Sequence, residues 1–147
     1  MRAGGDREVR RILRELSALV AHDADNITIM LDVLTELDCI VAKAALSRQL
    51  DAHAVSLNAQ GRIMLRQARH PLLAMAKVDV VANDLLFDES VKVLVISGPN
   101  TGGKTVALKT VGLLTLMALS GLPVPAASAN VCVLREVFTD IGDRQSI

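Results

Sequence analysis

Residues 98–105 carry the side chains best suited to chemistry in this chain. They read Gly-Pro-Asn-Thr-Gly-Gly-Lys-Thr, which has the G-x-x-x-x-G-K-S/T spacing of a phosphate-binding loop. In such a loop, backbone N–H groups and the lysine ammonium hold phosphate oxygens, while the last hydroxyl binds Mg²⁺. The motif predicts a nucleotide-phosphate site, with Thr105 as the metal ligand, formed by Gly98, Pro99, Asn100, Thr101, Gly102, Gly103, Lys104 and Thr105.

The sequence on either side of the loop is typical of the elements that position it. Residues 93–96 are a short apolar, β-branched run, which predicts a buried parallel strand. From Lys104 to Ser120 the chain is predicted to form a helix whose N-terminus faces the anion, and Gly121 ends it. The alternative interpretation, a glycine-rich structural turn, does not explain this order of strand, loop and helix.

Composition sets the outer limits on fold and partners. The chain has 147 residues, the length of one domain, and 51% hydrophobic residues, enough for a core. Sixteen basic and sixteen acidic side chains cancel, so no overall field indicates nucleic acid or a membrane as a partner. Cys39 and Cys132 are too few for a disulfide framework or a zinc site, which favours a reducing compartment.

The sequence also argues against secretion and membrane insertion. The first fifteen residues are densely charged and lack the apolar segment of a secretory signal. The long uncharged stretch 110–130 contains Gly121, Pro123 and Pro125, which disfavour a membrane span. We therefore expect a cytoplasmic protein with no membrane partner.

Residues 1–50 are predicted to form a helical arm. After a disordered lead over residues 1–6, apolar residues recur at helical spacing over residues 8–22 and again over residues 27–50. Residues 23–26 supply a break and a new helix cap. The narrow apolar stripes favour two helices packed on each other in an extended hairpin.

Residues 51–147 are predicted to form a second domain that contains the loop. Residues 55–58 and 62–65 are candidate strands of a hairpin or small sheet, joined by a turn at residues 59–61. Pro71 forces His70 into an extended conformation, and we interpret His70 as a structural histidine. Asn83 and Asp84 indicate a turn. Three further strands are expected at residues 77–82, 131–134 and 136–140.

No catalytic residue is assigned. Asp88 and Glu89 follow an apolar run, as do the magnesium-binding and water-activating carboxylates of P-loop enzymes. We reject that role because only three residues separate the pair from the predicted strand at residues 93–96, which leaves no room for a crossover helix. The chain is therefore expected to bind ATP but to hydrolyse it poorly by itself.

Several short segments resemble the MutS ATPases, over about residues 7–147. They are Arg69-His70-Pro71, Asn83-Asp84, the loop itself, Val124-Pro125-Ala126 and Thr139-Asp140-Ile141-Gly142-Asp143. Thr101 and Thr105, together with Asp-Ile-Gly-Asp, look like the second bacterial MutS paralogue, which lacks the mismatch-reading domain.

The resemblance implies a fold, a cofactor and partners. Residues 1–50 would be the end of the core and lever helices. Residues 51–147 would be the first part of an α/β, ABC-type P-loop ATPase with a parallel sheet and flanking helices, in which Val80 contacts the adenine. ATP and Mg²⁺ are the implied ligands. The implied partners are branched or mismatched DNA, or collided ribosomes, bound by a homodimer. The family's own Asp-Glu strand would lie beyond Ile147, which makes this chain a fragment.

Three functions remain open. The first is the ATP-binding portion of a MutS-type DNA-binding ATPase, acting in DNA repair, in the control of recombination or in ribosome rescue. The second is a non-catalytic helical interaction module with a vestigial phosphate loop. The third is a small P-loop kinase. The sequence leaves open whether this chain is itself an enzyme.

Overall fold

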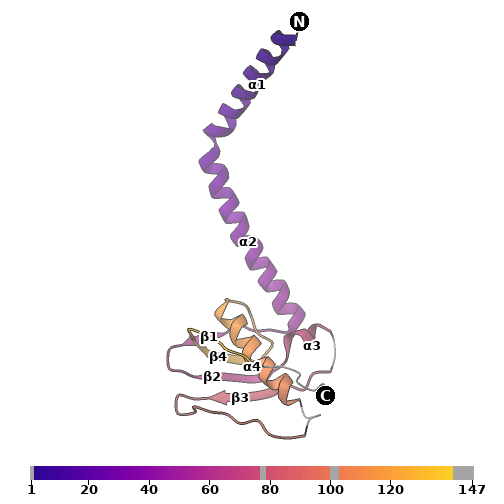
Figure 1. Cartoon of the computed structure of the whole chain (residues 1–147), viewed down its shortest axis with the longest axis vertical. Coiled ribbons are helices and arrows are strands. Elements are labelled where there is room, and N and C mark those ends of the chain that lie inside the picture. Colours follow the sequence, from indigo (N-terminus) through magenta and orange to yellow (C-terminus); the bar gives the residue numbers. More distant parts are fainter. Residues whose placement is uncertain (1, 77–78, 100–102, 141–147) are drawn as a thin grey trace. The chain divides into compact units, whose positions relative to one another are not determined.

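The computed structural model describes residues 2–76, 79–99 and 103–140 (Figure 1). Within these ranges, side-chain exposure is described from residue 5 onward. The chain divides into two compact units, Met1–Ala42 and Lys43–Ile147. Within the described residues, no helix is long and apolar enough to cross a membrane.

The first unit is helical. Helix α1 spans Arg2–His22 and helix α2 spans Ala24–Leu50, with Asp23 alone outside helical geometry. The predicted disordered lead is therefore wrong, because α1 already begins at Arg2. Gly5 lies inside α1. A glycine in a helix usually costs about 1 kcal/mol relative to alanine, and the other residues of this 21-residue helix offset that cost.

The predicted helical hairpin is also wrong. All side chains from residue 5 to residue 42 are exposed, including Leu19 at 67% and Met30 at 62%. An antiparallel helix pair needs a connecting loop of about two to five residues, whereas the carbonyl of Asp23 already accepts the Ile27 N–H at 2.9 Å as part of the next helical turn. The apolar stripes that predicted packing are left without a helical partner within this unit.

The second unit contains a four-stranded mixed sheet. Its strands are β1 (Ser56–Asn58), β2 (Ile63–Ala68), β3 (Asn83–Phe87) and β4 (Ser128–Cys132), in the order β1-β4-β2-β3. Only β1 and β4 are parallel, because β2 runs antiparallel to both β4 and β3. The predicted α/β class is confirmed, but the described sheet is mixed rather than parallel.

The strands β1 and β2 were predicted, and the turn between them forms. Asn58 Oδ1 accepts the Gln60 N–H at 3.0 Å, and Gly61 takes a φ of 72°. The two strands do not pair as a hairpin, however, because β4 lies between them and Val131 is opposite both Leu57 and Ile63. Val131 is completely buried, and β4, which comes from far along the chain, is one of the two inner strands of the sheet.

Strand β3 occupies the edge next to β2. The predicted turn at Asn83 and Asp84 is wrong, because both residues begin β3. Asp84 Oδ1 accepts the backbone N–H of Gln67 at 2.7 Å, at a point where the pairing register shifts. Of the strand predicted over residues 77–82, residues 77–78 lie outside the described residues and residues 79–82 are not a strand.

Two further predicted strands do not form, and a third is displaced. Residues 93–96 are irregular, with Val93 at 78% and Val95 at 80% exposed. Residues 136–140 are also irregular, and the strand expected at residues 131–134 is β4, Ser128–Cys132. A strand needs neighbouring strands to take its backbone hydrogen bonds. In the described structure neither irregular segment has such a neighbour.

Helix α4, Lys104–Leu119, covers one face of the sheet and completes the core (Figure 1). Its side chains Leu114 and Ala118 pack with Leu65, Val124 and Val131. The helix begins at Lys104 as predicted and ends one residue before the predicted end, and Gly121 beyond it has a φ of 69°. The core therefore fixes the sheet to the helix that begins at the phosphate-loop motif.

The short helix α3, Pro71–Met75, follows β2. His70 is extended, with φ −68° and ψ 119°, as expected for a residue before proline. Pro71 is the first residue of α3, a position that proline favours. His70 is buried and its Nδ1 has no hydrogen-bond partner, in keeping with a position inside the fold rather than on an open surface.

Candidate functional site

The two ends of the phosphate-loop motif lie in the described structure, and its middle does not. Gly98, Pro99, Gly103, Lys104 and Thr105 are described, whereas Asn100, Thr101 and Gly102 lie outside the described residues. Gly98 has a φ of 150° and Gly103 a φ of 75°. Side chains with a Cβ rarely adopt such positive φ values, so glycine is the favoured residue at both positions.

Lys104 joins the two ends of the motif. Its Nζ donates a hydrogen bond to the backbone carbonyl of Gly98. Lys104 is half-buried and is the first residue of α4, while Thr105 after it is exposed. The structure thus places the Lys104 side chain, which follows Gly103 in the chain, against the backbone of Gly98.

The start of α4 is a favourable place for an anion. Its N-cap is Gly103, which offers no side-chain oxygen to the first N–H groups, and no acidic residue lies in the first turn. The first backbone N–H groups of a helix lack partners within the helix, and the helix dipole is positive there. With the Lys104 ammonium beside them, these groups can bind a phosphate.

A magnesium ion bound at the phosphate-loop motif would have few protein ligands. Within the described part of the chain, no cluster of three or more histidine, cysteine, aspartate or glutamate side chains could hold a metal. Mg²⁺ bound with a nucleotide usually keeps several waters and takes most other ligands from the phosphates. A single hydroxyl beside the phosphate loop, that of Thr105, fits this kind of coordination.

Asp88 belongs to a turn and not to the loop. Its Oδ1 accepts hydrogen bonds from the Ser90 hydroxyl, from the Ser90 N–H at 2.9 Å and from the Val91 N–H at 3.2 Å. The Ser90 hydroxyl is the main cause that lowers the pKa of this carboxyl, and the positive charge of Arg62 contributes least. These bonds hold the Asp88 carboxylate in the turn that follows β3.

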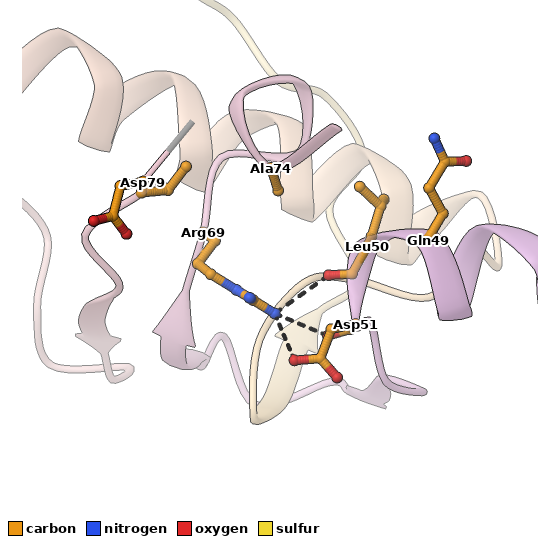
Figure 2. Close-up of a pocket in the computed structure, with 7 residues that line it drawn as sticks. Gln49, Leu50, Asp51, Arg69, Ala74 and Asp79 are labelled. Carbon is orange, nitrogen blue, oxygen red and sulfur yellow. Dashed lines mark hydrogen bonds and ion pairs between the residues drawn. The ribbon is translucent and has the colours of Figure 1, made fainter. Parts of the chain in front are cut away.

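Val80 lies in a separate hollow of about 210 Å³. Figure 2 shows side chains from the end of α2, from Arg69 after β2, from Ala74 in α3 and from the segment before β3 around it. No residue from 98–105 is among the described residues that line it. The lining residues are Gln49, Leu50, Asp51, Arg69, Ala74, Asp79 and Val80.

Arg69 organises one wall of this hollow. Its Nη2 donates to the carbonyl of Leu50 at 3.2 Å, and to the carbonyl and Oδ2 of Asp51 at 3.1 and 2.9 Å (Figure 2). Asp51 has a φ of 48°, a conformation that aspartate tolerates better than most residues. Sequence reasoning noted Arg69 only as part of a motif and missed Asp51, because their contact joins residues 18 positions apart.

Comparison with known proteins gives matches along almost the whole chain. The family model described as MutS domain V matches residues 94–147. A protein named Endonuclease MutS2 from Shouchella clausii is 54% identical over 142 residues, or 96% of this chain and 18% of that protein.

Two further proteins with the same name match as widely. The one from Pelotomaculum thermopropionicum is 51% identical over 146 residues, and the one from Halalkalibacterium halodurans is 48% identical over 147 residues. Each alignment covers 99% of this chain and 18% of the relative, so the chain spans less than a fifth of the curated relatives that it matches. The chain is thus similar over almost its whole length to a part of proteins named Endonuclease MutS2, and residues 94–147 match the model of MutS domain V.

Proposed function

We propose that this chain is the ATP-binding portion of a MutS2-type protein, with the phosphates held by residues 98–105 at the start of α4. The observation that carries this proposal is the hydrogen bond from Lys104 Nζ to the Gly98 carbonyl, which connects the two described ends of the motif at the start of α4. Asn100, Thr101 and Gly102 complete the loop in this proposal. Thr105 supplies a hydroxyl ligand to Mg²⁺, which offsets phosphate charge when it is bound.

We also propose that Val80 contacts the adenine. Its side chain is half-buried in the lining of the hollow, together with the end of α2, Arg69 and Ala74 of α3. An aliphatic side chain offers a base an apolar contact without the geometric demand of an aromatic stack. In this arrangement the phosphates and the base are bound by separate parts of the second unit.

Nucleotide binding and hydrolysis are separable in this proposal. Hydrolysis needs a group that positions the attacking water in addition to the groups that hold the phosphates. Asp88 is engaged in its own turn, and we assign no catalytic residue to this chain. We therefore propose that the chain binds ATP and turns it over slowly by itself.

The wider role follows from the family and is likewise a proposal. Residues 1–50 would be the helical arm and residues 51–147 the ATPase part of a longer, cytoplasmic protein. The relatives are named endonucleases, and we propose that this stretch supplies nucleotide binding to such a protein. Its proposed partners are branched or mismatched DNA, or the ribosome, bound by a homodimer.

A second candidate, the helical interaction module, is favoured by the exposed apolar side chains of the arm. Large apolar residues are exposed on both α1 and α2, among them Leu19 and Met30. Extended exposed apolar surface usually marks a contact with another protein surface. In that case the arm would bind a partner and the phosphate loop would have no ligand.

Titration with a fluorescent ATP analogue tests the proposal. We expect Lys104→Ala to weaken binding by roughly 10- to 100-fold, because hydrogen bonds to charged groups contribute about 1.5–3 kcal/mol. Lys109→Ala is the matched control, because it removes the same charge from an exposed position on the same helix. Equal affinity of a folded Lys104→Ala variant and the unmodified chain would contradict the proposal. Rapid multiple-turnover phosphate transfer would instead support the kinase.

A further inference from the structure

We propose that residues 92–96 form a strand on the free edge of β3 when phosphates bind at the start of α4. This inference rests on the proposed nucleotide-binding function and adds a conformational step to it. Three observations carry it: a turn that is already formed after β3, an open edge on β3, and the strand-like composition of the segment that leads into the phosphate-loop motif.

The turn after β3 directs the chain back along that strand. Val91 donates its backbone N–H to the Asp88 carbonyl at 3.1 Å, which closes a four-residue turn of the size that joins two hairpin strands. The Asp88 carboxylate also accepts the backbone N–H groups of Ser90 and Val91. In Figure 1 the chain turns back after the β3 arrow and returns below it. The start of a hairpin is therefore present, although the residues after the turn are irregular.

Strand β3 has an edge to which a further strand can be added. It is the last strand in the order β1-β4-β2-β3, so within the described part of the chain only β2 pairs with it. In an antiparallel strand, the backbone groups that face one edge recur at every second residue. Since the Asp88 carbonyl faces the returning chain, the N–H and C=O groups of Leu86 and Asp84 should face it too. These groups are the partners that residues 92–96 need to form a strand.

The turn also sets the register of the added strand. In a hairpin with a two-residue loop, the residues on either side of the loop pair one by one. Pairs that exchange backbone hydrogen bonds alternate with pairs that do not. Counted from the turn, the hydrogen-bonded pairs are Asp88 with Val91, Leu86 with Val93, and Asp84 with Val95.

This register would bury apolar side chains that are exposed in the described structure. Val93 is 78% exposed and Leu86 is 64% exposed, and the register places them directly opposite each other. Leu94, which is 44% exposed, would lie opposite Leu85, a residue that packs against the hydrophobic core. The removal of apolar surface from water favours pairing. The hydrogen bonds and the side chains therefore favour the same arrangement.

Phosphate binding should promote this pairing because the segment leads directly into the phosphate-loop motif. Residue 96 is two positions before Gly98, whose carbonyl accepts the hydrogen bond from Lys104 Nζ. Contacts that hold phosphates at the start of α4 also fix the end of the segment. A segment whose end is fixed loses less conformational entropy when it pairs. By reciprocity, the paired strand must raise the affinity for phosphates.

The decisive measurement is amide hydrogen exchange, followed by NMR with and without tripolyphosphate, which carries the phosphates alone. We expect tripolyphosphate to slow exchange at Val93 and Val95 about tenfold, as the gain of one hydrogen bond by each amide predicts. Lys92 and Leu94 are the internal controls, because their N–H groups would face away from β3 and should exchange at nearly unchanged rates.

Calorimetric titration with tripolyphosphate separates this inference from the proposed function. If tripolyphosphate binds and slows exchange no more at Val93 and Val95 than at Lys92 and Leu94, the inference is wrong and the phosphate site stands. Full protection of Val93 and Val95 without tripolyphosphate would also overturn the inference, because the pairing would not depend on phosphates. If tripolyphosphate does not bind, the proposed function and the inference are both wrong.

Two proline variants test the reciprocal effect on affinity. Val93→Pro removes an N–H that the added strand requires, whereas Lys92→Pro removes an N–H that faces away from β3. Both side chains are exposed, so neither substitution disturbs the core. We expect Val93→Pro to weaken tripolyphosphate binding about tenfold, as the loss of one hydrogen bond predicts, and Lys92→Pro to leave it nearly unchanged. Equal affinities of the two variants would contradict the inference.

Discussion

The two units of this chain are both rich in apolar side chains, yet among the described residues only the second unit buries any. From residue 5 to residue 42, every side chain is exposed, including long runs of leucine, isoleucine and valine. In the second unit, Leu65, Leu114, Val124 and Val131 are completely buried. A helical apolar stripe therefore shows which face can pack, whereas burial depends on a partner surface within reach.

The largest expected effect tests the core of the second unit. Leu114→Ala should lower the free energy of unfolding by about 2–5 kcal/mol, the range for a buried leucine, because Leu114 is fully buried against the sheet. Leu116→Ala, at an exposed position on the same helix, is the control. Chemical denaturation measures both, and similar losses for the two variants would show that the core lies elsewhere.

A second prediction concerns how α4 ends. Gly121→Ala should destabilise the second unit by roughly 1–2 kcal/mol, the penalty for a left-handed conformation with a side chain, because Gly121 has a φ of 69°.

Gly112→Ala is its control inside α4, where an added Cβ meets no atom within 4 Å. That substitution should stabilise the helix by about 0.5–1 kcal/mol. Thermal unfolding distinguishes the two, and stabilisation by both would contradict the described helix end.

The third prediction tests the exposed arm. Leu34 is 56% exposed on α2, so Leu34→Gln should change stability by no more than about 0.5 kcal/mol. Far-UV circular dichroism during denaturation provides the measurement. A loss comparable to that of Leu114→Ala would mean that the arm packs on another surface in solution, and would remove the contrast between the units.

The smallest expected effect is a pH dependence at the surface of the second unit. The hydrogen bond from the Ser90 hydroxyl lowers the pKa of Asp88 in the folded state. A carboxyl with a lowered folded pKa stabilises the fold above its ordinary pKa, and this stability is lost as the pH falls through the folded pKa.

An NMR titration of the Asp88 carboxyl should therefore show a midpoint below the usual aspartate range. Ser90→Ala should move this midpoint upward, with Ser56→Ala as a control outside the turn. A midpoint that Ser90→Ala leaves in place would contradict the described turn.

Local sequence determined the helices and the positions of the loop glycines. The helices α1, α2 and α4 follow from side-chain periodicity, and the breaks at Asp23 and Gly121 follow from residue type. The loop motif also contains Gly98 and Gly103, and the backbone takes a positive φ at both positions. These features depend on interactions between residues that are close in sequence, so a single sequence is enough to predict them.

Only the tertiary structure decided the pairing of the strands and the hollow beside Arg69. The insertion of β4 between β1 and β2 joins Val131 to residues more than 60 positions away, and no local pattern specifies that choice. The same holds for the contact between Arg69 and Asp51. Residues 93–96 have the composition of a strand and remain irregular, because β-structure requires hydrogen-bond partners that a strand does not itself contain.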